Sequence, residues 1–84
     1  MLGIFKRQKR TPEDLADQAR RILSGQYLKW DVDDYENASL QDPRLTDLHS
    51  KTLKFGLPEE WSKLDRAAQS ALGEIIEEMR RLGR

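Results

Sequence analysis

Residues 64–82 have the sequence LDRAAQSALGEIIEEMRRL. Its apolar residues recur at intervals of three and four, the spacing that places side chains on one face of an α-helix. The residues of this apolar face are Ala67, Ala68, Ala71, Leu72, Ile75, Ile76, Met79 and Leu82. Asp65 or Ser62 can cap the start, because a short polar side chain accepts hydrogen bonds from the first free backbone N–H groups. The pattern predicts a helix over 65–82.

The apolar face of this helix is wider than a single packed side requires. It covers roughly 180° of the helix circumference, whereas a helix that faces one core needs an apolar stripe of somewhat over 100°. We therefore predict that part of the face, formed by Leu72, Ile76 and Met79, contacts a second copy of the chain as a homodimer.

Two further helices precede this one. Thr11-Pro12 suits the N-cap and first position of a helix over 12–24, which Gly25 ends. Asp42-Pro43 repeats this start for a helix over 43–55. Both helices carry apolar residues at helical spacing, so both are expected to bury one face.

The remaining segments predict shorter elements. One or two helical turns are expected near 31–38 and again near 58–63, and a short strand over 27–30 is a further possibility. The fold class is therefore all-α, a small bundle of three main helices plus one or two short helical turns. The division predicted is a basic arm over 1–10 and a single helical domain over 11–84. The core is expected to contain Leu15, Ala19, Ile22, Leu23, Trp30, Val32, Tyr35, Leu45, Leu48, Leu53, Leu57, Trp61, Leu64, Ala68, Leu72, Ile75 and Met79.

The charges of the chain are balanced in total but unevenly distributed. The 84 residues include fifteen Lys and Arg and fifteen Asp and Glu, and no Cys. Residues 1–10 contain four basic and no acidic residues, whereas 11–84 contain eleven basic and fifteen acidic residues. A neutral total argues against a general nucleic-acid-binding protein, which carries a basic excess. The uneven distribution favours recognition of a charged partner.

The segment 31–47 holds six acidic residues and one Arg. The acidic residues are Asp31, Asp33, Asp34, Glu36, Asp42 and Asp47. Its start resembles a calcium-binding loop, but Glu36 stands where such a loop needs Gly, and Asp42 where it needs a bidentate Glu. Acid–base chemistry would need a water-excluding pocket, which so short a chain is not expected to form. We interpret the six residues as a helix start rich in Asp, or as an acidic face that binds a basic protein partner.

No residue set predicts catalysis, a metal site or a cofactor. His49 is the only histidine, and no Cys or Gly-x-Ser-x-Gly motif supplies a nucleophile beside it. We expect His49 to lie at the surface or at the margin of the core. The function predicted is a non-enzymatic protein-interaction module that uses the acidic face.

The arm over 1–10 supports an alternative function. It combines three apolar and four basic residues: Leu2, Ile4, Phe5, Lys6, Arg7, Lys9 and Arg10. Such a segment can rest on an anionic membrane surface, where each cation contributes about 1 kcal/mol. The alternative is therefore a peripheral membrane adaptor. The early cations interrupt any secretory leader, and no apolar run is long enough to cross a membrane, so a cytoplasmic protein is expected.

One block of sequence resembles known proteins. The stretch 30–36, WDVDDYE, followed by Asp42-Pro43-Arg44-Leu45, is similar to small bacterial proteins with an aromatic and Asp-rich block before an Asp-Pro-x-Leu helix start. Those proteins are mostly uncharacterised, and some look like immunity partners of toxins. The resemblance implies a small bacterial interaction protein and transfers no site residue.

Overall fold

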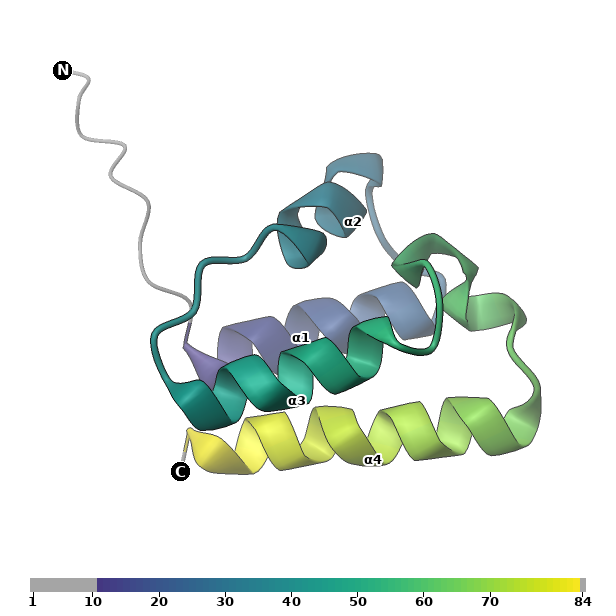
Figure 1. Cartoon of the computed structure of the whole chain (residues 1–84). Coiled ribbons are helices and arrows are strands. Elements are labelled where there is room, and N and C mark those ends of the chain that lie inside the picture. Colours follow the sequence, from purple (N-terminus) through teal and green to yellow (C-terminus); the bar gives the residue numbers. More distant parts are fainter. Residues whose placement is uncertain (1–10, 84) are drawn as a thin grey trace, which may run out of the picture.

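The computed structural model describes residues 11–83, which fold into helices without a strand. Four α-helices and one 3₁₀ helix follow one another along this part of the chain, as Figure 1 shows. They are α1 (Pro12–Leu23), α2 (Lys29–Glu36), α3 (Pro43–Leu53), η2 (Pro58–Lys63) and α4 (Arg66–Leu82). The all-α prediction is confirmed, and the strand considered over 27–30 is absent because α2 already begins at Lys29.

The predicted caps account for most of these boundaries. The Thr11 hydroxyl accepts a hydrogen bond from the Asp14 backbone N–H at 3.0 Å, and Asp65 accepts one from Ala68 at 2.8 Å. Gly25 adopts φ +80°, and the N–H of Gln26 reaches back to the Arg21 carbonyl at 2.9 Å. This is the Schellman arrangement that ends a helix, and it favours glycine at the left-handed position.

The central packing unit is the antiparallel pair of α1 and α4. Asp17 contacts Arg80 and Arg20 contacts Glu77, so the start of α1 lies beside the end of α4. α3 packs against α4, while η2 and α2 pack against α1, with α2 lying above the other helices in Figure 1. α4 therefore has two helical neighbours, α1 and α3, within the same chain.

These two neighbours explain why the predicted self-association face is wrong. Leu72, Ile76 and Met79 have no exposed surface in the monomer, since all three belong to the core. A broad apolar face was expected to need a second copy, but α1 and α3 together cover it. Side chains with no accessible area cannot form a dimer contact while this fold is intact.

A polar cluster lies inside the core beside Trp61. The Thr52 hydroxyl donates to the His49 carbonyl at 2.6 Å, so its oxygen accepts the hydroxyl proton of Tyr35 at 2.7 Å. The Nε2 atom of His49 lies 2.7 Å from the Tyr35 carbonyl oxygen. The rings of Tyr35 and Trp61 meet edge to face, with centroids 5.5 Å apart. Burial raises the pKa of Tyr35 to about 12, so its phenol stays protonated at neutral pH.

The core prediction is wrong at two large residues. Trp30 keeps 57% of its surface exposed and Leu57 keeps 53%. Leu57 stands immediately before η2, and the residues of η2 that turn inward are Pro58 and Trp61. Two core residues were not predicted as such, Ala16 and Ile76, and both are fully buried.

Candidate protein-interaction surface

The first of the six predicted acidic residues is buried. Asp31 keeps only 2% of its surface exposed, so it does not belong to an accessible acidic face. Its carboxylate accepts hydrogen bonds from Gln18 Nε2 at 3.0 Å, from the Leu28 backbone N–H at 2.9 Å, and from Arg21 at 3.4 Å. Burial raises the pKa of Asp31, but these three donors outweigh it, and the net pKa is lowered. Asp31 acts as a structural anchor for the start of α2.

Gln18 joins the acidic helix to α1. Its Nε2 atom donates to Asp31 Oδ1 and also to Asp34 Oδ2, each at 3.0 Å. Gln18 is buried, whereas Asp34 remains exposed at the surface. The bond therefore fixes the position of the Asp34 carboxylate and leaves part of it accessible to a partner.

Two other predicted acidic residues act within α3. Asp42 caps this helix through the Arg44 backbone N–H at 2.9 Å, and hydrogen bonds from Arg44 lower the pKa of Asp42. Asp47 forms an i,i+4 ion pair with Lys51 at 3.3 Å. Both carboxylates have local partners, which makes them weaker candidates for recognition.

The two remaining acidic residues of α2 differ in exposure. Asp33 is exposed and Glu36 is half-buried. Within the described residues, neither side chain makes an ion pair with a Lys or Arg. In that part of the chain, neither carboxylate therefore has a counter-ion. Together with Asp34 they form the accessible part of the predicted acidic face.

Trp30 shares the outer side of α2 with Asp33 and Asp34. A spacing of three and four residues places Asp33 and Asp34 on the same helical face as Trp30, and all three are exposed. Trp30 points outward because α2 begins at Lys29, which makes Asp31 the third helical residue and turns Val32 and Tyr35 inward. We define Trp30, Asp33 and Asp34, with Leu28 beside them, as the α2 surface.

A shallow groove borders the α2 surface on the side of α1. Leu28, which is 62% exposed, and Trp30 contribute apolar side chains to its lining, and Arg21 contributes a cation. The groove is lined by Arg21, Gly25, Gln26, Tyr27, Leu28, Trp30 and Asp31. The Tyr27 hydroxyl donates to the Glu59 carbonyl of η2 at 3.3 Å, which holds this connection against the body of the protein. The segment that carries the exposed Leu28 and Trp30 is therefore anchored to η2 by this hydrogen bond.

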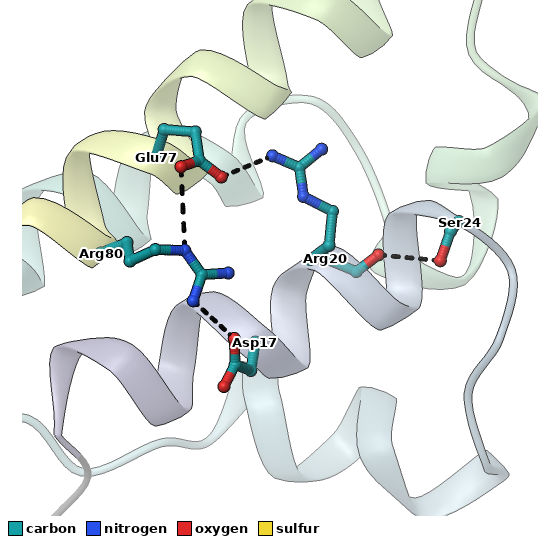
Figure 2. Close-up of polar contacts among 5 residues, drawn as sticks. All are labelled: Asp17, Arg20, Ser24, Glu77 and Arg80. Atoms are coloured by element: carbon teal, nitrogen blue, oxygen red, sulfur yellow. Dashed lines mark hydrogen bonds and ion pairs between the residues drawn. The ribbon is translucent and has the colours of Figure 1, made fainter.

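A second polar cluster joins α1 to α4, and Figure 2 shows its members. Asp17 binds Arg80 at 2.7 Å, Arg80 approaches Glu77 at 3.7 Å, and Glu77 binds Arg20 at 2.8 Å. The hydrogen bond from Arg20 lowers the pKa of Glu77, and the bond to Asp17 raises that of Arg80. Because these charges already pair with one another, we assign this cluster to helix packing.

Two other kinds of functional feature are absent from the part of the chain that the structure describes. In residues 11–83, no three His, Asp or Glu side chains gather where they could hold a metal ion. No helix in that range is long and apolar enough to span a membrane. His49 is buried rather than exposed, since its imidazole bonds the Tyr35 carbonyl between α2 and α3. The arm over 1–10, on which the membrane alternative depends, lies outside the described residues.

No protein-family model matches this chain, and comparisons with curated proteins and with solved structures found no significant match. The resemblance to small bacterial proteins therefore stays a prediction, as do the absence of catalysis and the basic protein partner. What the chain does has to be inferred from its own side chains.

Sequence reasoning missed Trp30 and Leu28 as parts of this surface, and Gln18 as the buried residue that positions Asp34. Leu28 and Asp31 stand three residues apart, a spacing that allows a helix start at Lys29 with Asp31 as the third helical residue and Trp30 turned outward. The same sequence equally allows Asp31 to cap a helix that starts at Val32, and Leu28 has no side-chain oxygen that would mark it as an N-cap. No local pattern identifies Gln18, because its partners lie 13 and 16 residues further along the chain.

Proposed function

We propose that this protein is a non-enzymatic interaction module that binds a basic segment of a protein partner through the α2 surface. The observation that carries the proposal is the exposed Trp30 one helical turn before two exposed carboxylates, Asp33 and Asp34, on one helical face. Tryptophan is among the residues most enriched at the energetic centres of protein interfaces. This proposal narrows the predicted acidic face from six residues to the part that remains accessible.

The chemistry of the α2 surface favours an arginine or lysine side chain. The face of an indole ring attracts a cation by about 0.5–2 kcal/mol, depending on how far the site is desolvated. The carboxylates of Asp33 and Asp34 can accept charge-assisted hydrogen bonds from the same cation. A guanidinium satisfies both groups, since it is planar enough to stack on Trp30 and has several N–H donors.

The apolar neighbour extends this recognition beyond a single cation. Leu28 precedes Trp30 by two residues and exposes most of its surface beside the groove. A partner segment that combines cations with apolar side chains can therefore contact Leu28 and the acidic residues together. α2 contains four acidic residues and one basic residue, Lys29, so its net negative charge attracts such a segment electrostatically.

The experiment is a titration of the full chain with a hexa-arginine peptide, followed by NMR at the two indole N–H groups. The signal of Trp30 is expected to shift and that of the buried Trp61 to stay. Trp30→Ala should weaken binding about 30-fold if the ring is an interface centre worth roughly 2 kcal/mol. Trp30→Phe keeps an aromatic face and should weaken it less.

A matched pair of charge variants separates local recognition from general attraction. Asp33→Asn removes one carboxylate from the α2 surface, and Asp47→Asn removes one from α3. The proposal expects a clear loss of affinity only for Asp33→Asn. Equal losses for both variants, together with an unmoved Trp30 signal, would show that the peptide follows net charge and would overturn the proposal.

A further inference from the structure

We propose that the basic arm of the same chain, residues 1–10, covers the α2 surface until a partner displaces it; this inference rests on the function proposed above. The arm would act as an internal ligand of the site. The basis is the charge and apolar content of the arm, the composition of the surface, and the position from which the arm departs.

The arm and the α2 surface are complementary in two properties. The arm carries four cations and no acidic residue, while Asp33 and Asp34 stand on the surface beside Trp30. Its apolar residues Leu2, Ile4 and Phe5 match the exposed Leu28 and Trp30. The arm therefore has the chemistry that the proposed partner is expected to have.

The arm departs from a point within reach of this surface. It joins the described residues at Thr11, next to the start of α1, and α2 runs back above α1 in the opposite direction (Figure 1). The twelve residues of α1 span about 18 Å. Ten extended residues span up to about 33 Å. The arm can therefore follow α1 along its whole length and still reach Trp30.

Acidic side chains mark this route. Asp14 lies exposed in the first turn of α1, one helical turn before Gln18. Gln18 in turn holds the carboxylate of Asp34 at 3.0 Å. Cations leaving Thr11 in this direction would pass Asp14 first and then Asp34. On the α4 side of α1, Asp17 is already paired with Arg80, and Glu13 lies against Gly83 at the end of α4.

Coverage by the arm would regulate the site by competition. If the arm occupies the surface for nine-tenths of the time, a partner binds about tenfold more weakly than it would to the open surface. A partner with more cations, or with a better apolar anchor, would displace the arm. Exposure of Trp30 would then depend on the presence of the partner.

The test uses a spin label placed on the arm of the full chain. The protein contains no cysteine, so Gln8→Cys gives a single attachment point. The amides over 28–34 and the Trp30 indole N–H should lose NMR intensity through the nearby label. Ser70 is the matched control position, because it lies near the same end of α1 but on the α4 side, beside Arg20 and Ser24. The arm proposal expects stronger broadening at Trp30 than at Ser70.

Charge variants of the arm complete the experiment. Replacing Lys6, Arg7, Lys9 and Arg10 by Gln should restore the Trp30 signal. The same number of replacements at Lys54, Lys63, Arg66 and Arg81 should leave it broadened. Equal broadening at Trp30 and Ser70 would overturn the inference. A mixing experiment identifies which chain supplies the arm. The inference would also be overturned if the Trp30 signal of an isotope-labelled chain without the spin label were broadened as strongly when spin-labelled chains are added, because the arm of a second copy would then be the one in contact.

The label reports arm docking without any added ligand, which keeps the two proposals separable. If hexa-arginine fails to bind even to the chain with a neutralised arm, the proposed function fails while the arm contact can still be observed. If hexa-arginine binds the original and neutralised chains equally well, the arm does not compete and the inference fails alone. About tenfold tighter binding to the neutralised chain supports both.

Discussion

Gly73 stands in the interior of α4, buried beneath the Arg20 side chain of α1. A methyl group added at this position would lie 3.5 Å from Arg20 Nη1 and 3.9 Å from Nη2, which are ordinary van der Waals distances. The Gly73 backbone is helical and has no positive φ. Neither the space nor the backbone therefore requires glycine here, and Gly73→Ala is expected to stabilise the fold.

The magnitude follows from helix propensity. Glycine in a helix interior is about 1 kcal/mol less favourable than alanine, because it loses more backbone entropy on folding. The new methyl group could disturb only the Arg20–Glu77 pair, whose side chains are 44% and 43% exposed. A pair this exposed contributes at most about 1 kcal/mol. We expect the free energy of unfolding to rise by about 0.5–1 kcal/mol, which raises Tm by roughly 3–7 °C for a chain of this size.

The assay is urea denaturation followed by circular dichroism, in which the midpoint should rise while the slope stays unchanged. Gly25→Ala is the matched control, because its φ of +80° strains an L-residue and should cost about 1 kcal/mol. The same gain should appear when Gly73→Ala is made in an Arg20→Ala chain. A lower midpoint for Gly73→Ala, abolished by Arg20→Ala, would show that Arg20 needs the space and would refute the reasoning.

Two further predictions concern buried polar groups. Thr52→Val should lower the free energy of unfolding by about 1–3 kcal/mol, because it leaves the buried Tyr35 hydroxyl without its acceptor. Tyr35→Phe removes that hydroxyl as well and should lower it by only about 0.5–1.5 kcal/mol. Urea denaturation of both variants at pH 7 tests this order. Asp31 has a lowered pKa in the folded state, so its contribution to stability is complete above the usual aspartate value of 3.8 and is lost as pH falls through the folded value. The difference in stability between the original chain and Asp31→Asn should therefore shrink from pH 7 to pH 3, and a constant difference would contradict the role assigned to the carboxylate.

The helices α1, α3 and α4 could be predicted from the sequence because their starts are set by local chemistry. Thr11, Asp42 and Asp65 each accept a backbone hydrogen bond within three residues, and this bond forms wherever the rest of the chain lies. α2 is different. Asp31 can serve as its N-cap or as its third residue, and local spacing allows both. Gln18 and Arg21, more distant in sequence, bind the carboxylate in the second arrangement.

The apolar face of α4 shows a second limit of sequence patterns. The width of the face correctly indicated that α4 packs against more than one partner. It does not show whether the second partner is another helix of the same chain or a second copy. α3 supplies it within the monomer. Leu72, Ile76 and Met79 are consequently core residues and are not available for a dimer contact. Self-association of the chain itself stays a prediction.

The burial of Asp31 and the exposure of Trp30 are two results of one choice of helix start. The fold buries a carboxylate and exposes an indole, which reverses the usual distribution of these residue types. Three hydrogen-bond donors compensate the buried Asp31, whereas within the described residues nothing covers the outer face of Trp30. Burying a large apolar side chain contributes roughly 2–3 kcal/mol, and about half of this is forgone at Trp30 in the monomer. A contact that covers Trp30 gains that energy without changing the core, which is why binding, by the arm or by a partner, is expected on α2 rather than on the already paired face between α1 and α4.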